Sequence, residues 1–342
     1  MPVALLCLVA FLPPEDPGDD PAANSPAVEG PVIEKQDVDP ATAPLPPAKT
    51  LEDGVRVWGN LPFRRAGGET LRMDLAIPPL DIYRADPPRT PLLVFVHGGG
   101  WVAGTKLRYQ SEILARARGG AAAATIEYRL SRVAEGGKYV APFPAALEDV
   151  RAALAFLVDR ADELNIDPAR IALIGDSAGG HLSLLAALSA NETPGGDRGT
   201  KDEPNASPRI PVAAVVNLFG VTDMPAYYTG SRHARSVLSL FLEGHLAVRQ
   251  AAYEAASPVR FIDADDPPVL TLHGTADPVV PYDQAEILHE TLKEAGVSNE
   301  LVPVPGGTHG LFRERGAVRN RVSRFLAAQL RPAAKVPAAG GP

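Results

Sequence analysis

The sequence contains only one cysteine, Cys7, among its 342 residues. A single cysteine excludes an intrachain disulfide and a zinc finger, and its position near the N-terminus leaves no cysteine nucleophile in the body of the chain. The seven histidines are scattered. They show no His-x-x-x-His spacing, and no cluster of carboxylates accompanies them. The sequence therefore predicts no metal site.

Positive charge is also scarce, because 33 Lys and Arg face 41 Asp and Glu, for a formal net charge of -8. Nucleic acids and anionic membranes bind basic surfaces, so we expect neither as a partner. Long apolar runs are missing too, and the run Val3–Leu12 is too short to span a bilayer. We therefore predict no integral membrane span. The 45% of hydrophobic residues is nevertheless sufficient for a sizeable core.

The two ends of the chain differ in composition from its centre. Residues 1–12 have the length of the apolar part of a signal peptide, but no basic residue precedes the run and no clean Ala-x-Ala site follows it. Two locations stay open: export to the periplasm or the medium, and the cytoplasm. Residues 13–50 are rich in proline and acidic side chains, which predicts a disordered linker. Residues 332–342 predict a disordered tail.

Strand-like and helix-like segments alternate over residues 51–331, which we expect to form one catalytic domain. The apolar run Leu92–Val96 is typical of a buried parallel strand, and Pro144–Leu164 has helical spacing of its apolar residues. This alternation predicts an α/β fold with a mostly parallel central sheet flanked by helices. Residues 222–258 are longer than a usual crossover and predict a short cap insertion. Further strands are expected at Leu71–Ile77, Ala121–Ile126, Ile171–Ile174, Val212–Phe219, Val269–Leu272 and Leu301–Val304, and a last helix at Val318–Leu330.

The strongest local motif is Gly175-Asp176-Ser177-Ala178-Gly179-Gly180, which lies between a predicted strand and a predicted helix. A sharp strand-to-helix turn crowds the backbone, which explains a glycine two positions before and two positions after the serine. Such a turn exposes the serine hydroxyl and directs a helix N-terminus at it. A glycine-rich phosphate turn is the alternative, but it would leave the serine unexplained and lacks the lysine of a Walker motif. We interpret Ser177 as a nucleophile.

A second glycine-rich motif, His97-Gly98-Gly99-Gly100-Trp101, directly follows the predicted strand Leu92–Val96. Acyl transfer needs at least two backbone N–H donors directed at the developing oxyanion. Glycine lets the backbone approach a substrate closely. We assign the oxyanion hole to the amides of Gly99, Gly100 and Ala178, without deciding which glycine contributes. His97 and His181 are interpreted as scaffold residues that flank this site.

A serine nucleophile needs a base, and the base needs an acid that orients it. His309 lies in a glycine-rich loop after the last predicted strand, and Asp277 follows the strand before that. The order serine, acid, histidine is that of an α/β-hydrolase triad. Asp223 is the rival acid, and its other interpretation is a helix cap.

The other histidines after Ser177 are not expected to act in catalysis. We expect His289 and the cap histidines His233 and His245 to be exposed. His273, which ends the strand Val269–Leu272, is expected to make a structural hydrogen bond.

Together these motifs resemble the α/β-hydrolase superfamily over residues 55–330. Within it, the segments 97–101 and 175–181 are similar to those of hormone-sensitive-lipase-like esterases and of feruloyl and acetyl-xylan esterases. The segment 127–131 and the turn 167–171 are similar to landmarks of the same groups. The resemblance implies a serine carboxylesterase that needs no cofactor and forms an acyl-enzyme. Its expected substrates are small-molecule or polysaccharide esters with short acyl groups, including acetyl or feruloyl esters.

Two other function classes stay open from the sequence. The histidine–glycine–glycine loop is also similar to that of kynurenine formamidases, so an arylformamidase or another amide hydrolase is the alternative enzyme. Some hydrolase folds serve only as binding proteins. Such proteins usually lack a member of the triad, whereas every candidate is present here.

Overall fold

A computed structural model describes residues 39–80, 88–189, 210–310 and 315–332. The expected signal-like segment, most of the linker and the tail from 333 lie outside these residues. The strands are β1 (Lys49–Thr50), β2 (Arg56–Ala66), β3 (Glu69–Ile77), β4 (Thr90–Val96), β5 (Ala122–Ile126), β6 (Arg132–Val133), β7 (Tyr139–Val140), β8 (Ile166–Asp176), β9 (Ala214–Leu218), β10 (Val269–Gly274) and β11 (Asn299–Val304). The helices are α1 (Gln110–Arg118), α2 (Ala145–Asp159), α3 (Ala161–Leu164), α4 (Ala178–Leu188), α5 (Met224–Gly230), α6 (Arg232–Phe241), α7 (Leu246–Ala255), α8 (Asp283–Glu294) and α9 (Arg315–Gln329), with 3-10 turns at Lys106–Tyr109, Glu135–Gly137 and Pro258–Phe261.

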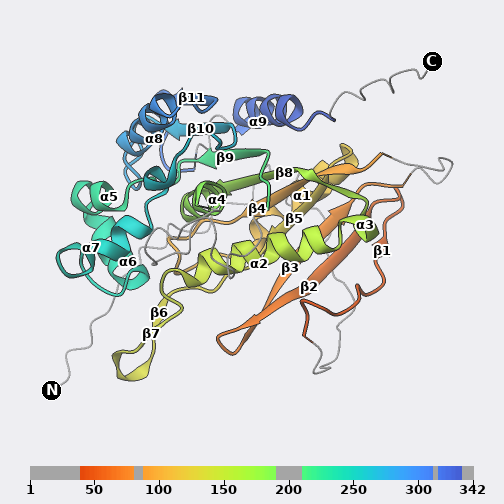
Figure 1. The fold of residues 1–342 in the computed structure, drawn as a ribbon, viewed down its shortest axis with the longest axis horizontal. Helices are drawn as coiled ribbons and strands as arrows, with labels where there is room; N and C mark the ends of the chain where they lie inside the picture. Colours follow the sequence, from red (N-terminus) through yellow and green to blue (C-terminus); the bar gives the residue numbers. More distant parts are fainter. Residues whose placement is uncertain (1–38, 81–87, 190–209, 311–314, 333–342) are drawn as a thin grey trace, which may run out of the picture.

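Most of these strands form one twisted sheet in the order β1-β2-β3-β5-β4-β8-β9-β10-β11 (Figure 1). The strands from β5 to β11 in this order are parallel, and β1, β2 and β3 pair antiparallel at one edge. The predicted α/β-hydrolase fold with a mostly parallel sheet is confirmed. The strands β6 and β7 form a separate short hairpin.

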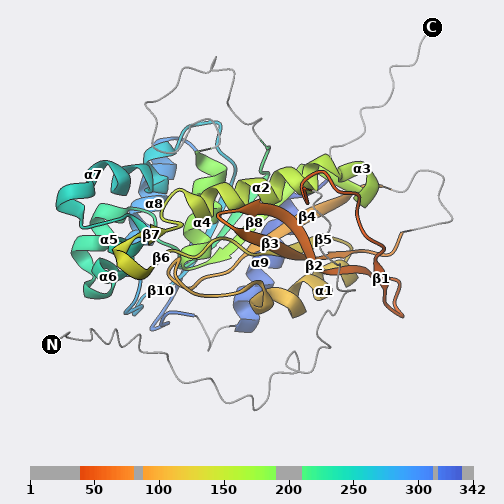
Figure 2. The same ribbon diagram turned by 90° about the horizontal axis from the view of Figure 1, so that it is seen from below.

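Helices cover both faces of the sheet (Figure 2). In β4, Leu92, Val94 and Val96 pack on the face that carries α2, α4 and α8. Leu93 and Phe95 point to the opposite face, which α1 and α9 cover. Because successive strand residues point to opposite faces, a strand buried on both sides must be apolar throughout. This requirement explains the continuous apolar run of β4.

One expectation about the chain before β3 is corrected by the structure, and one strand there was not predicted. The linker was expected to reach Thr50, yet Pro40 is buried and Lys49–Thr50 pairs with β2. The indole N–H of Trp58 donates to the carbonyl oxygen of Pro46, which holds this segment against the sheet. The strand β2 was not predicted, because charged and polar residues interrupt its apolar pattern.

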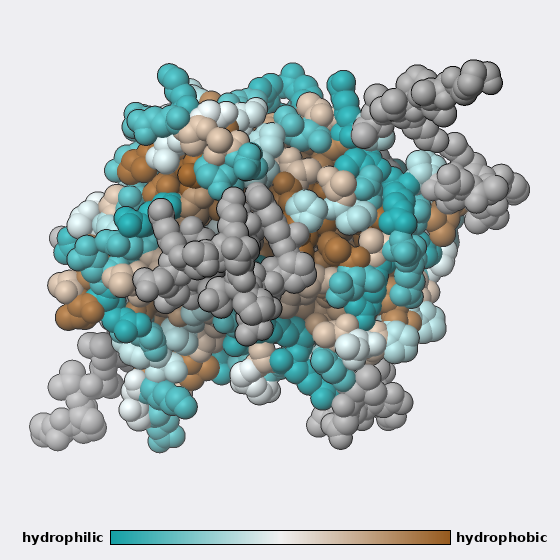
Figure 3. All heavy atoms as spheres, viewed as in Figure 1, coloured by the Kyte–Doolittle hydropathy of each residue, from teal (hydrophilic) through white to brown (hydrophobic). Residues whose placement is uncertain are grey.

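Three helices occupy the segment that was expected to form a cap. The helices α5, α6 and α7 follow β9 and lie at one end of the molecule in both ribbon views (Figures 1 and 2). The face in Figure 3 carries hydrophilic residues interspersed with smaller hydrophobic areas. No helix in the described part of the chain is long and apolar enough to cross a membrane.

The carboxyl ends of the parallel strands meet at one edge of the sheet. At the end of β4, Val96 is paired with Gly175 of β8, and Asp176 of β8 is paired with Leu218 of β9. The strands β10 and β11 also end at the same level. Chain segments that leave these strands therefore start side by side. In open α/β sheets this edge is where ligands bind.

A buried ion pair connects the antiparallel edge to the helix layer. The ammonium of Lys106 lies 2.7 Å from a carboxylate oxygen of Asp74, and both side chains are almost fully buried. Asp74 also accepts hydrogen bonds from the Gln110 side chain and the backbone N–H of Asn60. These contacts satisfy the carboxylate away from water, and removing one partner would leave a buried charge without compensation.

We expect Lys106→Met to lower the free energy of unfolding by about 3–5 kcal/mol, because Asp74 would keep a buried charge. The matched control is Arg118→Met, which breaks the exposed ion pair between Arg118 and Asp53. Exposed pairs contribute about 0–1 kcal/mol, so this variant should unfold almost like the wild type. Urea denaturation of the three proteins measures the difference. Equal losses in the two variants would contradict this account of the buried pair.

Candidate active site

The turn that carries Ser177 has the strained geometry of a nucleophile elbow. Ser177 has φ 52° and ψ -120°, between the end of β8 and the start of α4. A Cβ atom on Gly175 would lie 2.2 Å from the carbonyl oxygen of Gly179, and one on Gly179 would lie 2.0 Å from that of Val96. Neither position can carry a side chain. Such crowding is typical of an elbow that presents its serine above the sheet.

Ser177, His309 and Asp277 form a continuous chain of hydrogen bonds. The Nε2 atom of His309 lies 3.1 Å from Oγ of Ser177. Its Nδ1 atom lies 2.8 Å from a carboxylate oxygen of Asp277. Because a carboxylate accepts, Nδ1 carries the proton and the lone pair of Nε2 faces the serine hydroxyl. This tautomer is the one that can remove a proton from the serine.

The surroundings of Asp277 favour its charged form. Burial acts to raise the pKa of Asp277, but hydrogen bonds from His273 and His309 and the N–H of Val279 outweigh it and leave the pKa well below its usual value. His273 lies 3.5 Å from the same carboxylate oxygen, and its Nε2 donates to the carbonyl oxygen of Val280. The carboxylate therefore stays negative and holds His309 in its orientation.

The other candidates lie elsewhere. Asp223, the rival acid, accepts a hydrogen bond from the N–H of Ala226 and caps α5. In the cap, His233 and His245 are exposed. His289 was expected to be exposed, and this was wrong. It is buried between α8 and β11, where its Nδ1 lies 2.9 Å from the side-chain oxygen of Asn299.

The loop after β4 supplies unoccupied backbone donors. Among the described residues, the N–H groups of Gly99, Gly100 and Ala178 donate to no acceptor. Gly99 has φ 126° and Gly100 has φ 59°, a region that favours glycine. Ala178 is the first residue of α4, where backbone N–H groups have no helical acceptor. These three amides are therefore free to donate to a ligand.

Asp176 fixes this loop to the elbow. One carboxylate oxygen accepts from the N–H of Gly98 at 3.0 Å and from the hydroxyl of Tyr109 at 2.7 Å. The other lies 3.0 Å from the guanidinium of Arg108. Sequence reasoning did not single out this role, because the partners lie 67 to 78 positions away along the chain. The residue directly before the nucleophile thus positions the loop that carries the free amides.

Trp101 forms a second link between the loop and the rest of the site. Its indole N–H donates to Nδ1 of His181 at 3.0 Å, and Nε2 of His181 donates to the carbonyl oxygen of Ala256 at 2.7 Å. The indole also stacks on Phe241 of α6, with ring centroids 4.6 Å apart. His97 and His181 are scaffold residues in this geometry, as expected. Phe219, directly after β9, packs on the ring of His309 and was missed from the sequence.

Comparison with known proteins shows that the chain is similar to esterases. A family model named BD-FAE matches residues 80–292. Esterase LipQ of Mycobacterium tuberculosis is 30% identical over 283 residues, which cover 78% of this chain and 61% of the relative. Ethyl acetate hydrolase of Pseudomonas putida is 29% identical over 265 residues, 74% of this chain and 75% of the relative. The alignments with the first three curated relatives span only 61%, 58% and 45% of their lengths.

Solved structures of esterases have the same fold. A truncated carbohydrate esterase from gut microbiota superposes with a TM-score of 0.65 at 27% identity, covering 82% of this chain and 98% of the other. A propionate-bound esterase, Est2 of Thermogutta terrifontis, has a TM-score of 0.62 at 26% identity, covering 82% and 97%. These similarities agree with the resemblance inferred from the motifs.

The burial of His181 predicts a specific loss of stability in acid. Burial lowers the pKa of His181 to about 4, whereas an unfolded histidine titrates near 6.5. Between these values the unfolded chain binds more protons, so stability should fall as the pH drops from about 6.5 to about 4. His181→Gln keeps one donor and one acceptor but does not titrate. The advantage of the wild type over this variant should shrink by about 3 kcal/mol between pH 7 and pH 4.

Chemical denaturation at a series of pH values measures this difference. Because the two proteins differ only at position 181, the comparison isolates His181. Parallel stability curves for the wild type and His181→Gln would show that the imidazole is not held neutral by this site.

Proposed function

We propose, from the premise that this chain belongs to the BD-FAE family of α/β hydrolases, that it hydrolyses carboxylic esters with Ser177 as nucleophile, His309 as base and Asp277 as orienting acid. The observation that carries this proposal is the hydrogen-bonded chain from Ser177 through His309 to Asp277 at the carboxyl edge of the sheet. The names of the relatives support an ester as the substrate.

The reaction proceeds in two steps through an acyl-enzyme. Nε2 of His309 takes the hydroxyl proton as Oγ of Ser177 attacks the ester carbonyl. The tetrahedral intermediate collapses, and the protonated His309 gives this proton to the leaving alcohol. Water then attacks the acyl-enzyme while His309 takes a proton from that water. The second tetrahedral intermediate collapses, His309 returns this proton to Oγ of Ser177, and the carboxylic acid leaves. Asp277 keeps its negative charge throughout and stabilises the imidazolium that forms.

The amides of Gly99, Gly100 and Ala178 bind the developing oxyanion in this mechanism. Their N–H groups have no acceptor in the described part of the chain, so they donate without first breaking a protein hydrogen bond. One such donor typically contributes about 3 kcal/mol to transition-state stabilisation. Asp176 and Trp101 act as positioning residues, because they hold the loop and do not touch the reacting atoms.

Short acyl groups are the proposed substrates. One curated relative is named for the hydrolysis of ethyl acetate, and one of the similar solved structures holds propionate. Both names point to acyl groups of two or three carbons.

We expect p-nitrophenyl acetate to be cleaved faster than the longer esters up to decanoate, because the site is proposed to accept short acyl groups. Ser177→Ala should lower kcat by at least about 10⁴-fold, since triad members act as a unit. Release of p-nitrophenol measures both the preference for acyl chain length and the loss of activity in Ser177→Ala. The matched control for the leaving group is p-nitroacetanilide, which carries the same acyl group on an amide.

Three outcomes would contradict this proposal. Activity that rises toward decanoate would exclude the short-acyl preference. Full activity of Ser177→Ala would exclude Ser177 as nucleophile. Faster cleavage of the anilide than of the acetate ester would favour the amide hydrolase that the sequence left open.

Acetyl or feruloyl esters of plant polysaccharide are the proposed natural substrates. The similar solved structure of a carbohydrate esterase supports a carbohydrate as the alcohol. Access to such a polymer requires export, which the apolar run at 3–12 is proposed to direct. We expect the purified protein to release acetate from acetylated xylan, as measured by enzymatic determination of acetate. Unchanged acetate after addition of an enzyme that is active on p-nitrophenyl acetate would exclude acetylated xylan.

A further inference from the structure

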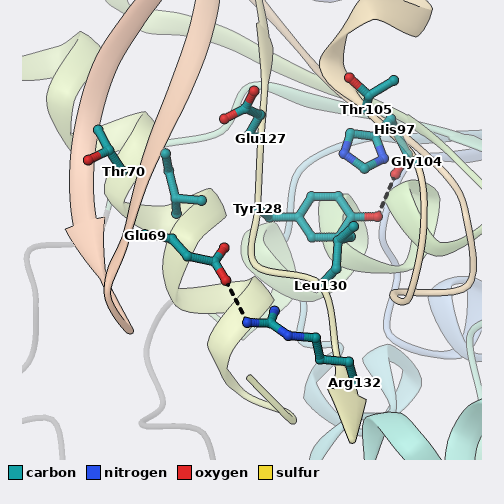
Figure 4. Close-up of a pocket in the computed structure, with 10 residues that line it drawn as sticks. Glu69, Thr70, His97, Gly104, Thr105, Glu127, Tyr128, Leu130 and Arg132 are labelled. Atoms are coloured by element: carbon teal, nitrogen blue, oxygen red, sulfur yellow. Dashed lines mark hydrogen bonds and ion pairs between the residues drawn. The ribbon is translucent and has the colours of Figure 1, made fainter. Parts of the chain in front are cut away.

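A small cavity lies behind the loop that carries the free amides (Figure 4). Its volume is about 230 Å³, and its walls come from the start of β3, the loop after β4 and the segment after β5. Ligand sites for larger molecules typically have about 300–1,000 Å³. At roughly 30 Å³ for each water molecule, this cavity has room for several waters or one small ring.

The cavity and the triad lie on opposite sides of the same loop. The cavity opens over β3, β5 and β4, whereas Ser177, Asp277 and His309 follow β8, β10 and β11. The sheet order puts β4 between these two groups of strands. The start of β3 reaches this edge because β3 runs antiparallel to β5. Both sites therefore share the carboxyl edge, with the glycine loop between them.

Two hydrogen-bond acceptors in the cavity wall have no partner. Nδ1 of His97 lies 2.8 Å from the carbonyl oxygen of Gly98, so it carries the proton and leaves a lone pair on Nε2. One oxygen of Glu127 accepts from the N–H of Arg72 at 3.0 Å. Within the described residues, Nε2 of His97 and the second oxygen of Glu127 accept no hydrogen bond. A ligand that fits must therefore donate hydrogen bonds.

The charges around the cavity disfavour an anion. Glu127 and Glu69 would repel an anion, and the guanidinium of Arg132 is already paired with Glu69 at 3.0 Å. Figure 4 shows this ion pair between Glu69 and Arg132. Hydroxyl groups on an uncharged ligand meet these conditions.

The remaining walls are suited to the faces of a ring. Leu130 supplies apolar surface, and the ring of Tyr128 stacks on His97 with centroids 4.3 Å apart. The hydroxyl of Tyr128 is engaged with the carbonyl oxygen of His97 at 2.9 Å. The hydroxyl of Thr70 adds one more group that can both donate and accept. Apolar walls with a few placed polar groups are typical of a small-molecule site.

We infer that this cavity binds one uncharged, hydroxyl-bearing ring and serves as a subsite for a sugar unit next to the one that carries the ester. The inference rests on the proposed function, because the ring belongs to the carbohydrate whose acyl group reaches Ser177. Glu127 and His97 accept hydrogen bonds from its hydroxyl groups. Because His97 begins the glycine loop, a ring bound here lies against the segment that also serves the nucleophile.

Binding is tested without catalysis by titrating the full-length Ser177→Ala protein with unacylated xylotriose in a calorimeter. We expect binding that weakens at least about tenfold when Glu127→Gln is added, since the variant loses a charged hydrogen-bond acceptor. The matched control adds Glu290→Gln, an exposed residue of α8 on another part of the molecule, and should bind like the parent. Absence of binding, or equal binding by all three proteins, would overturn the inference.

Kinetics separate this inference from the proposed function. For acetylated xylotriose, Glu127→Gln should raise KM about tenfold relative to KM for p-nitrophenyl acetate, whereas a general structural defect would affect both substrates alike. If acetylated xylotriose is deacetylated and Glu127→Gln leaves the ratio of the two KM values unchanged, the subsite is excluded and the esterase proposal stays intact. Xylotriose binding that needs Glu127, without any deacetylation, would instead contradict the carbohydrate esterase proposal.

Discussion

At the carboxyl edge of the sheet, the turn after β8 passes so close to the end of β4 that no side chain fits between them. Gly179 packs on the carbonyl oxygen of Val96, and Gly175 packs on Gly179. This close packing forces Ser177 to a positive φ and lifts its hydroxyl above the sheet. It also brings the glycine loop after β4 next to the start of α4. The nucleophile and the proposed oxyanion donors are thus positioned by one steric constraint.

Polar contacts between distant segments hold that arrangement in place. Asp176 joins the elbow to Gly98, and Trp101 joins the loop to α4 through the neutral imidazole of His181. Buried polar networks are stable when every member is satisfied, and these groups are paired on both sides. The cap contributes as well, because Phe241 stacks on Trp101. The loop is therefore fixed from the sheet, the helix layer and the cap.

Local patterns predicted most of the fold and the three residues of the hydrogen-bonded chain. The contact between Gly175 and Gly179 lies within five residues, and the apolar run of β4 reflects burial on both faces, so both are visible in the sequence. The contacts of Asp176 and the packing of Phe219 on His309 depend on tertiary structure and leave no local signal. The burial of His289 was missed because its partner Asn299 lies on a separate strand. The strand β2 was missed because its apolar pattern is interrupted.

The central claim is that Ser177 is the nucleophile that His309 activates. Reaction with a fluorophosphonate, followed by mass spectrometry of the intact protein and of its peptides, tests this claim most directly, because the reagent mimics an acyl substrate. The account predicts one adduct per chain, located on Ser177, absent from Ser177→Ala and formed much more slowly by a folded His309→Asn variant. An unreactive wild-type protein, or an adduct that persists in Ser177→Ala, would contradict it.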